Sequence, residues 1–250
     1  MIHIERKAQN AVKNVLSFVY FSGNICNMYK IDHLLNANEE VGVIMKDFYV
    51  DLHIHIGRTA SGKPVKITGS KTLTLHTILQ CASSQKGLDM IGVIDCHSPE
   101  VLVEIEGLLK RGEMIELAEG GLRFQETTLL LGSEIEVYDS HCHGPIHVLA
   151  YFPTIEKMKA FSDWMSNHVK NISLSSQRIY VEGRALQQKV YEYEGLFVPA
   201  HVFTPFKSLY GKGVKRSLTE VFDPNYIDAI ELGLSSDTQM VRNIKELQQY

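Results

Sequence analysis

The sequence predicts an α/β fold, because short apolar runs typical of buried strands alternate with segments whose apolar residues have helical spacing. The runs at 90–95, 128–137 and 146–152 have the length and composition of strands, whereas 155–169 repeats its apolar residues as a helix does. Repeated strand–helix units favour a parallel sheet or barrel. A chain of 250 residues is long enough to bury one sizeable core.

The other elements follow from local signals. Residues 72–85 are predicted to form a helix that stops at Gly87, and 100–110 a helix that begins after a Ser-Pro pair. Further along, the pattern predicts a helix at 182–194, strands at 196–201 and 227–232, and a last helix at 237–249.

Residues 1–44 differ from the rest of the chain. Residues 5–21 have the pattern of one helix, but 23–38 is polar and has no clear period. Met45 directly precedes a strong strand pattern, and 39–42 can be encoded by a purine-rich stretch like a ribosome-binding site. We therefore expect residues 1–44 to come from an over-extended gene model. A genuine N-terminal helix is the alternative, and the mass of the native protein distinguishes the two.

Composition bounds the functional classes. The 44% hydrophobic and 22% charged content is that of an ordinary globular protein, and the net charge of −4 supplies no general basic field for nucleic acid. A nucleic-acid partner would need local basic patches. The apolar run 15–21 is too short to span a bilayer and lacks a secretory cleavage site. The four cysteines form no Cys-x-x-Cys pair, so we expect a reduced cytoplasmic protein.

The strand predicted at 46–56 has one apolar and one polar face. Its apolar face carries residues 48, 50, 52, 54 and 56. Its polar face carries Asp47, Tyr49, Asp51, His53 and His55. Two imidazoles two positions apart on one strand can bind the same ion or neighbouring ions. Taken alone, the pair would be better explained as half-exposed surface histidines.

Ionisable side chains recur at the ends of later strands, and this recurrence changes the interpretation. They are Asp95 and His97 after 91–94, Glu134 and Glu136 after 129–133, His147 at the start of 146–152, and His201 after 197–200. In parallel α/β folds the carboxyl ends of the strands converge on the active site. Because unpaired buried ionisable groups are costly, five such strands in order predict a metal site.

The motifs DLHIH, IDCH, GSEIE, IHVLAY and PAH together resemble the PHP family of metal-dependent phosphoesterases. The resemblance implies a distorted (β/α)7 barrel with two or three divalent ions, zinc, manganese or magnesium, at the strand C-termini. The metal ligands that it implies are His53, His55, Asp95, His97, Glu134, His147 and His201. His53, His55, Asp95 and Glu134 are also the catalytic candidates.

Two features depart from the family pattern. Cys96 separates Asp95 from His97, which are adjacent in the family, so one of the two need not be a ligand. The family's last ligand motif, Asp-x-His, has no counterpart before Tyr250. We therefore expect 45–250 to be a PHP domain that stops short of this motif and binds metal weakly.

Three loops resemble one branch of this family, endonuclease Q, more specifically than the metal motifs do. They are 57–70, 173–180 and 199–205, and with the metal motifs the likeness covers nearly all of 45–250. The resemblance implies an endonuclease of DNA repair that cuts DNA on the 5′ side of deaminated bases such as uracil and hypoxanthine. Such an enzyme needs the altered base turned out of the stack.

Basic side chains in these loops are candidates for substrate contacts. Arg58, Lys63 and Lys66 lie in a loop without acidic residues directly after the metal histidines, and Arg58 is the best candidate for a phosphate contact. Gln177 and Arg178 are further candidates. The basic, aromatic segment 206–216 is explained equally well as a nucleic-acid contact or as a solvated loop.

Two other functions stay open. A small-molecule phosphatase of the histidinol phosphatase type needs only a compact phosphate pocket, for which the long basic loop after His55 is surplus. An inactive PHP fragment is the third possibility. Cleavage of a deaminated oligonucleotide separates the first two functions, and metal content separates both from the third.

Overall fold

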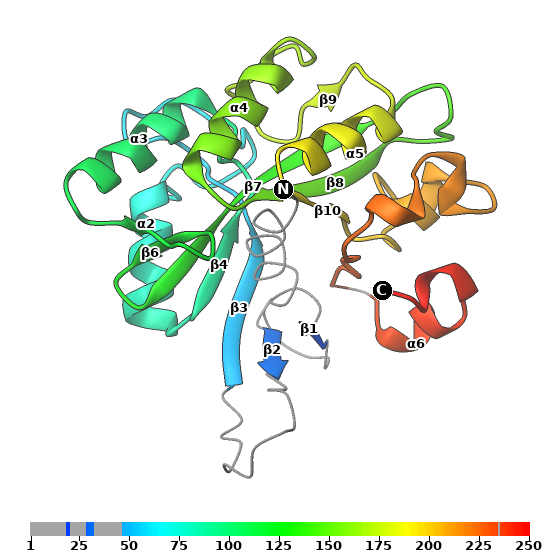
Figure 1. Cartoon of the computed structure of the whole chain (residues 1–250), viewed down its shortest axis with the longest axis horizontal. Coiled ribbons are helices and arrows are strands. Elements are labelled where there is room, and N and C mark those ends of the chain that lie inside the picture. The colour runs from blue at the N-terminus through cyan, green and yellow to red at the C-terminus, as the bar shows by residue number, and fades with distance from the viewer. Residues whose placement is uncertain (1–18, 21–28, 33–46, 235) are drawn as a thin grey trace, which may run out of the picture.

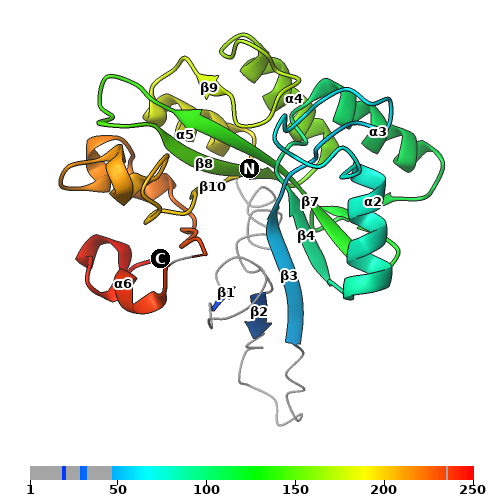
Figure 2. The ribbon, with the colours of Figure 1, turned by 180° about the vertical axis from the view of Figure 1, so that it is seen from behind.

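The computed structural model describes residues 19–20, 29–32, 47–234 and 236–250. Within these residues a mixed β-sheet curls, and four helices cover its convex face (Figures 1 and 2). These helices are α2 (Leu75–Gln80), α3 (Pro99–Lys110), α4 (Ile155–Ser166) and α5 (Gly183–Glu192). None of the described helices is long and apolar enough to cross a membrane.

The strands form one sheet with a branched order. They are β1 (Val19–Tyr20), β2 (Tyr29–Asp32), β3 (Asp47–Ile54), β4 (Met90–Val93), β5 (Ile115–Glu116), β6 (Leu122–Phe124), β7 (Thr127–Val137), β8 (Ile146–Phe152), β9 (Arg178–Ile179) and β10 (Leu196–Pro199). The main path runs β1-β2-β3-β4-β7-β6-β5, while β8 and β9 pair with β7 and β10 pairs with β8.

Strand β7 organises the sheet because four strands pair with it. Its first half pairs with β4 in parallel and with β6 in antiparallel orientation. Its second half pairs with β8 in antiparallel and with β9 in parallel orientation. The segment after β4 fills the gap between β4 and β9, where the Glu134 amide donates to the Ile94 carbonyl at 2.8 Å. Glu134 is therefore held by the centre of the sheet.

The sheet is mixed, whereas the repeated strand–helix units favoured a parallel sheet or barrel. Strand β8 runs antiparallel to both β7 and β10. The connection from Val137 to Ile146 is too short for the crossover that a parallel pair requires. Because β8 is reversed, its first residues, rather than its last, lie beside the C-terminal half of β7.

Alternate residues of β7 face two different apolar clusters. Leu129, Leu131 and Ile135 belong to the larger core, which also contains buried residues of the covering helices. Leu130 belongs to a smaller cluster with side chains from β8 and β10, on the other face. Glu134 and Glu136 lie on the same face of β7 as Leu130, because side chains alternate along a strand. Apolar side chains are therefore followed by acidic ones along this face.

Strand β3 departs from the strict alternation predicted for 46–56. Its pairing with β4 shifts register between Asp51 and Ile54. As a result Leu52 packs on the smaller cluster, whereas Ile54 packs on the larger one. A Cβ atom at Gly92 would lie 2.5 Å from the Leu52 carbonyl oxygen, so the shift requires glycine on the neighbouring strand.

Most other predicted elements are present with shifted ends. Helix α2 continues into a π-helical turn, η1 (Cys81–Lys86), which stops at Gly87 with φ of 60° as predicted. The strand predicted at 227–232 is irregular, although the Glu231 amide donates to the Pro199 carbonyl beside β10. The helix predicted at 237–249 is broken into α6 (Thr238–Arg242) and a 3-10 turn, η5 (Lys245–Leu247).

The N-terminal prediction falls mostly outside the described residues. Of the helix predicted at 5–21, only Val19–Tyr20 are described, and they form strand β1 instead. Strand β2 pairs antiparallel with β3. The hairpin of β5 and β6 and the short strand β9 were not predicted, because strands of two or three residues have no readable period.

Candidate metal centre

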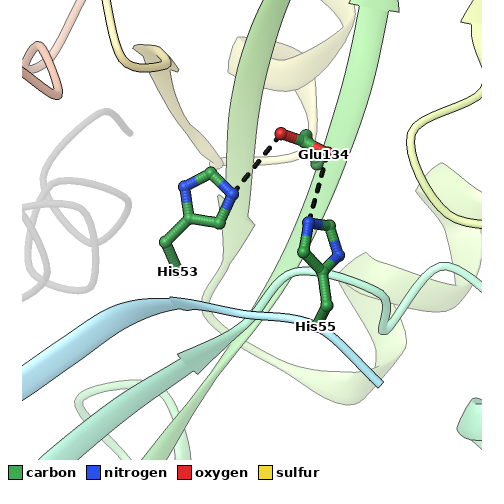
Figure 3. A group of neighbouring side chains, drawn as sticks. All are labelled: His53, His55 and Glu134. Atoms are coloured by element: carbon green, nitrogen blue, oxygen red, sulfur yellow. Dashed lines mark ion pairs between the residues drawn. The ribbon is translucent and has the colours of Figure 1, made fainter. Parts of the chain in front are cut away.

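Four histidines surround the carboxylate of Glu134. His53 lies near the end of β3 and His55 follows its last residue, while His147 is the second residue of β8 and His201 follows β10. Figure 3 shows the rings of His53 and His55 pointing towards Glu134, and each ring pairs with a different oxygen of its carboxylate. Among the residues that the structure describes, two groups have ligand atoms close enough for a metal ion, His53-His55-Glu134 and Glu134-His147-His201.

Glu134 is the member that the two groups share. Its Oε1 lies 3.4 Å from His53 Nε2, 2.9 Å from His147 Nδ1 and 3.6 Å from His201 Nε2. Its Oε2 lies 3.4 Å from His55 Nε2. The Glu134 side chain is only 2% exposed, so these imidazoles replace water around the carboxylate. One carboxylate placed in this way can bridge two ions.

Three of the four histidines are held by an oxygen acceptor on Nδ1. Asp95 lies 3.1 Å from His55 Nδ1, Glu231 lies 2.8 Å from His53 Nδ1, and the Thr204 hydroxyl lies 3.1 Å from His201 Nδ1. An acceptor on Nδ1 fixes the proton there and leaves the Nε2 lone pair free. All three rings therefore present an unprotonated Nε2 towards Glu134 when they are neutral.

His147 is turned the other way. Its Nδ1 faces Glu134, and its Nε2 lies 3.7 Å from a carboxylate oxygen of Glu136, beyond hydrogen-bond range. Within the described residues this buried Nε2 has no hydrogen-bond partner. Lys207 holds the same Glu136 oxygen at 2.9 Å, and the His147 amide donates to the Lys207 carbonyl. A buried ring nitrogen without a partner is a group that a ligand would satisfy.

The carboxylates shift the pKa values of the histidines strongly. Burial alone would lower the pKa of His53, but Glu231 and Glu134 beside it outweigh burial and raise its pKa to about 10. The pKa of His55 is also raised, since Asp95 and Glu134 outweigh burial. Burial opposes ionisation of Glu134, yet the surrounding imidazoles hold its pKa well below the usual range. The carboxylates around the cluster therefore favour the protonated forms of His53 and His55.

The residues of the site fit divalent cations. Imidazole and carboxylate suit zinc, manganese and iron, and the acceptors on Nδ1 give three rings the required tautomer. The raised pKa values of His53 and His55 also favour cation binding, since they reflect an excess of negative charge around the rings. The His/Glu clusters could thus hold metal ions in place of the protons.

Two predicted ligands lie outside these groups. Asp95 accepts hydrogen bonds from His55 Nδ1 and from the Ile56 amide, so it orients a ligand instead of joining the group. His97 is fully buried and uses both ring nitrogens elsewhere, Nδ1 towards the Ser133 hydroxyl at 2.9 Å and Nε2 towards the Leu174 carbonyl at 3.3 Å. Burial lowers the pKa of His97. Both ring nitrogens of His97 thus have partners within the protein, and His97 lies outside the two groups of candidate ligands.

In the loop after His55, Lys66 lies closest to Glu134 rather than Arg58. The loop folds back, and the Lys66 amide donates to the Ile56 carbonyl. Lys66 Nζ then reaches Glu134 at 3.4 Å and the Ser176 hydroxyl at 2.7 Å. Arg58 donates to the Gly62 carbonyl, and Lys63 pairs with Glu100. Among the three predicted phosphate contacts, Lys66 is the one that the loop brings to the cluster.

The other predicted substrate contacts are on the segment that contains β9. Gln177 donates from its side chain to the Ser175 carbonyl at 3.4 Å. Arg178 on β9 lies opposite Glu136 in the register of the sheet. Its side chain is exposed and donates to the Tyr138 carbonyl. Between Gln177 and the cluster, the Ser176 hydroxyl contacts Glu134 directly.

Sequence reasoning missed Glu231, which joins two parts of the site. One of its carboxylate oxygens accepts from His53 Nδ1, and the other accepts from the His201 amide at 2.9 Å. Burial opposes its ionisation, but His53 holds the pKa of Glu231 below its usual value. A signal was present, since an acidic residue in the apolar segment 227–232 repeats the pattern of the earlier strands.

Backbone strain occurs at the site. Of the five described non-glycine residues with positive φ angles, three lie around the cluster, Ser176 at 53°, His201 at 32° and Lys207 at 54°. Each of these conformations costs free energy that surrounding contacts must offset, and such residues gather at functional sites. Strain in three separate loops at one cluster supports its identification as the functional centre.

Known proteins share this fold. No protein-family model matches the chain. YqxK, an uncharacterized protein of Bacillus subtilis (strain 168), is 61% identical over 206 residues, 82% of this chain and 53% of that protein. The crystal structure of PfuEndoQ, a lesion-specific endonuclease from Pyrococcus furiosus, matches with a TM-score of 0.62 and 28% identity over 78% of this chain and 44% of that chain.

A second solved structure, endonuclease Q with a 27-mer duplex substrate that has an abasic lesion at the active site, matches with the same TM-score of 0.62 and 28% identity over 77% of this chain. The chain is thus a structural match to endonuclease Q. Its curled sheet carries His/Glu clusters that could hold metal ions, as a metal-dependent phosphoesterase of the PHP type requires. The chain spans 53% of the length of YqxK and 44% of PfuEndoQ.

Proposed function

We propose that this chain is the metal-dependent domain of an endonuclease resembling endonuclease Q. It hydrolyses the DNA phosphodiester on the 5′ side of deaminated bases, uracil or hypoxanthine. Its fold is part of a PHP-type distorted (β/α)7 barrel. The observation that carries the proposal is Glu134 between four histidines, in a chain that matches two endonuclease Q structures.

The proposed roles follow from the geometry. His53, His55, Glu134, His147 and His201 would hold two ions, with Glu134 shared between them. When bound, such ions polarise the phosphoryl group and the attacking water and neutralise developing charge. Asp95 and Glu231 would keep the tautomers of His55 and His53.

Lys66 is the proposed phosphate contact of this chain. The Lys66 side chain is 25% exposed, and its ammonium group contacts Glu134 and Ser176 at the edge of the cluster. A phosphate oxygen that approaches the cluster can take the place of either partner, and a point charge such as lysine suits this contact. Lys66→Ala is therefore expected to raise the KM for DNA and to leave the metal content of the protein nearly unchanged.

The proposal is tested by incubating the protein, with manganese or magnesium, with a duplex that contains one uracil or hypoxanthine. A cut on the 5′ side of the altered base, lost in His53→Ala and retained in His76→Ala, is the expected result. His76 is a matched control because it is an exposed histidine on α2.

Other outcomes have definite meanings. Hydrolysis of a simple phosphomonoester without DNA cleavage would replace the endonuclease by a small-molecule phosphatase. Absence of both activities, in protein shown to be loaded with metal, would contradict a hydrolytic function for this chain.

A further inference from the structure

An exposed strip of aromatic and basic side chains lies beside the cluster. We define the aromatic–basic strip as Tyr138, Lys170, Arg178 and Tyr180. The Arg178 guanidinium lies 4.7 Å from the centre of the Tyr138 ring and 5.5 Å from that of the Tyr180 ring. The ammonium group of Lys170 lies 5.8 Å from the Tyr180 ring centre. Cations and aromatic rings therefore alternate along the strip.

The strip continues the face of the sheet that carries the cluster. Glu134 and Glu136 lie on one face of β7, and alternation places Tyr138 next on that face. On β9, Arg178 is registered opposite Glu136, while Ile179 is 1% exposed in the larger core on the other face. Arg178 and Tyr180 therefore lie on the side of the His/Glu cluster.

The strip is open to solvent and carries positive charge. Tyr138 is 37% and Tyr180 52% exposed. Within the described part of the chain neither Lys170 nor Arg178 forms an ion pair with a carboxylate. Of the acidic residues nearby, Glu136 pairs with Lys207 at 2.9 Å, and Asp139 accepts hydrogen bonds from the His141 and Gly183 amides.

We propose that the aromatic–basic strip binds an unpaired stretch of the DNA strand beside the bond that is cut. Bases stack on exposed tyrosine rings whatever their identity, and Arg178 and Lys170 attract the phosphates between them. Stacked base pairs hide the faces of their bases, so paired DNA gains only the charge contacts. The strip thus selects DNA that is locally opened, which deepens and rests on the endonuclease function proposed above.

Binding is tested apart from catalysis, with metal removed by a chelator. Fluorescence anisotropy gives the Kd of a labelled single-stranded oligonucleotide and of the matching blunt duplex. Tyr180→Leu is expected to raise the Kd of the single strand about tenfold. Tyr180→Phe keeps the ring and is expected to bind within about twofold of the unaltered chain. Tyr138→Leu is expected to behave as Tyr180→Leu does.

The control is Tyr191→Leu, because Tyr191 is a 54% exposed tyrosine on α5 that contacts Tyr226 edge to face and is not part of the strip. The proposal is overturned if the unaltered chain does not bind the single strand, or if Tyr180→Leu binds it with unaltered Kd. It is also overturned if Tyr180→Leu loses equal affinity for single strand and duplex, or if the Leu and Phe variants lose equal affinity. Lesion cleavage with unaffected Tyr180→Leu binding rejects the strip alone. The expected binding differences without any cleavage reject the endonuclease alone.

Discussion

The histidines of the metal centre owe their orientation to oxygen acceptors that do not themselves face Glu134. Asp95 and Glu231 each pair with the Nδ1 of one ring, at 3.1 and 2.8 Å. Because tautomer and ring orientation decide whether Nε2 can donate its lone pair, these carboxylates are positioning residues. Glu231 also accepts from the His201 amide, so it sets two ligands at once.

Replacing Glu231 should therefore weaken metal binding. We expect Glu231→Ala to lower the affinity for zinc or manganese about 10–100-fold, as loss of an outer partner does. Glu231→Gln should lose less metal affinity, since the amide oxygen of glutamine can still accept a hydrogen bond from His53 Nδ1. Competition with a chromogenic chelator measures the affinity. Glu192→Gln is the control, because Glu192 is exposed and, among the described side chains, forms an ion pair only with Lys189. Equal affinity in Glu231→Ala would contradict the positioning role.

His97 gives the opposite expectation. Because both its nitrogens bond within the protein and its side chain is fully buried, His97→Ala should lower the free energy of unfolding by about 2–4 kcal/mol. Metal stoichiometry should stay unchanged in the folded protein. Urea denaturation and metal analysis measure the two quantities. Loss of metal without loss of stability would return His97 to the ligands.

At the residue scale, local sequence predicted the groups that lie on strands but not their partners. His53, Glu134 and His201 follow or end apolar runs, so period and strand direction indicated them. Glu231 was missed because its contact with His53 spans 178 positions and passes through an irregular segment. Lys66 was ranked below Arg58 because the fold-back of the loop depends on tertiary hydrogen bonds.

At the scale of elements, the approach of β3 to β4 positions the first two histidines. The register shift that turns Leu52 to the smaller cluster leaves no space for a side chain at Gly92. The atoms in conflict are backbone atoms of the neighbouring strand, which cannot rotate away.

A methyl group at position 92 should disturb both fold and site. We expect Gly92→Ala to lower the free energy of unfolding by about 2–4 kcal/mol and to weaken metal binding, because β3 must move. Gly107→Ala is the matched control, since Gly107 lies within α3 and its Cβ would meet only the flexible end of Arg111 at 3.1 Å. That variant should gain about 0.5–1 kcal/mol. Urea denaturation of both variants gives the comparison.

The elements themselves were largely predictable, and their pairing was less so. Helix α3 begins after Ser98 and strand β8 has its predicted bounds, because both depend on local pattern. The direction of β8 and the irregular 227–232 segment depend on partners elsewhere in the chain. The register shift in β3 has no local signature except the neighbouring glycine.

For the whole molecule, the raised histidine pKa values predict how stability depends on pH. The pKa of His53 rises from its usual 6.5 to about 10 in the folded chain, against the effect of burial, because of Glu231 and Glu134. The folded state therefore binds the proton more tightly than the unfolded state. This stabilisation is fully present below pH 6.5 and is lost as the pH rises through about 10.

The metal-free chain should therefore become less stable between pH 7 and 9. Its affinity for divalent metal should increase over the same range, since the ions compete with these protons. Urea denaturation with a chelator present measures the first trend, and chelator competition measures the second. His53→Gln should flatten the first trend. Stability that increases with pH would contradict the raised pKa of His53.

The contact of His53 with Glu231 closes a loop of 178 positions, and the same carboxylate holds the His201 amide. Translation proceeds from the first residue to the last, so a nascent chain that has emerged only to residue 200 lacks both His201 and Glu231. Its His53 has no oriented tautomer, and Glu134 lacks one of its four imidazoles. Because His201 and Glu231 follow all ten strands of the described sheet in the sequence, the residues of the sheet are synthesised before the centre has all of its groups.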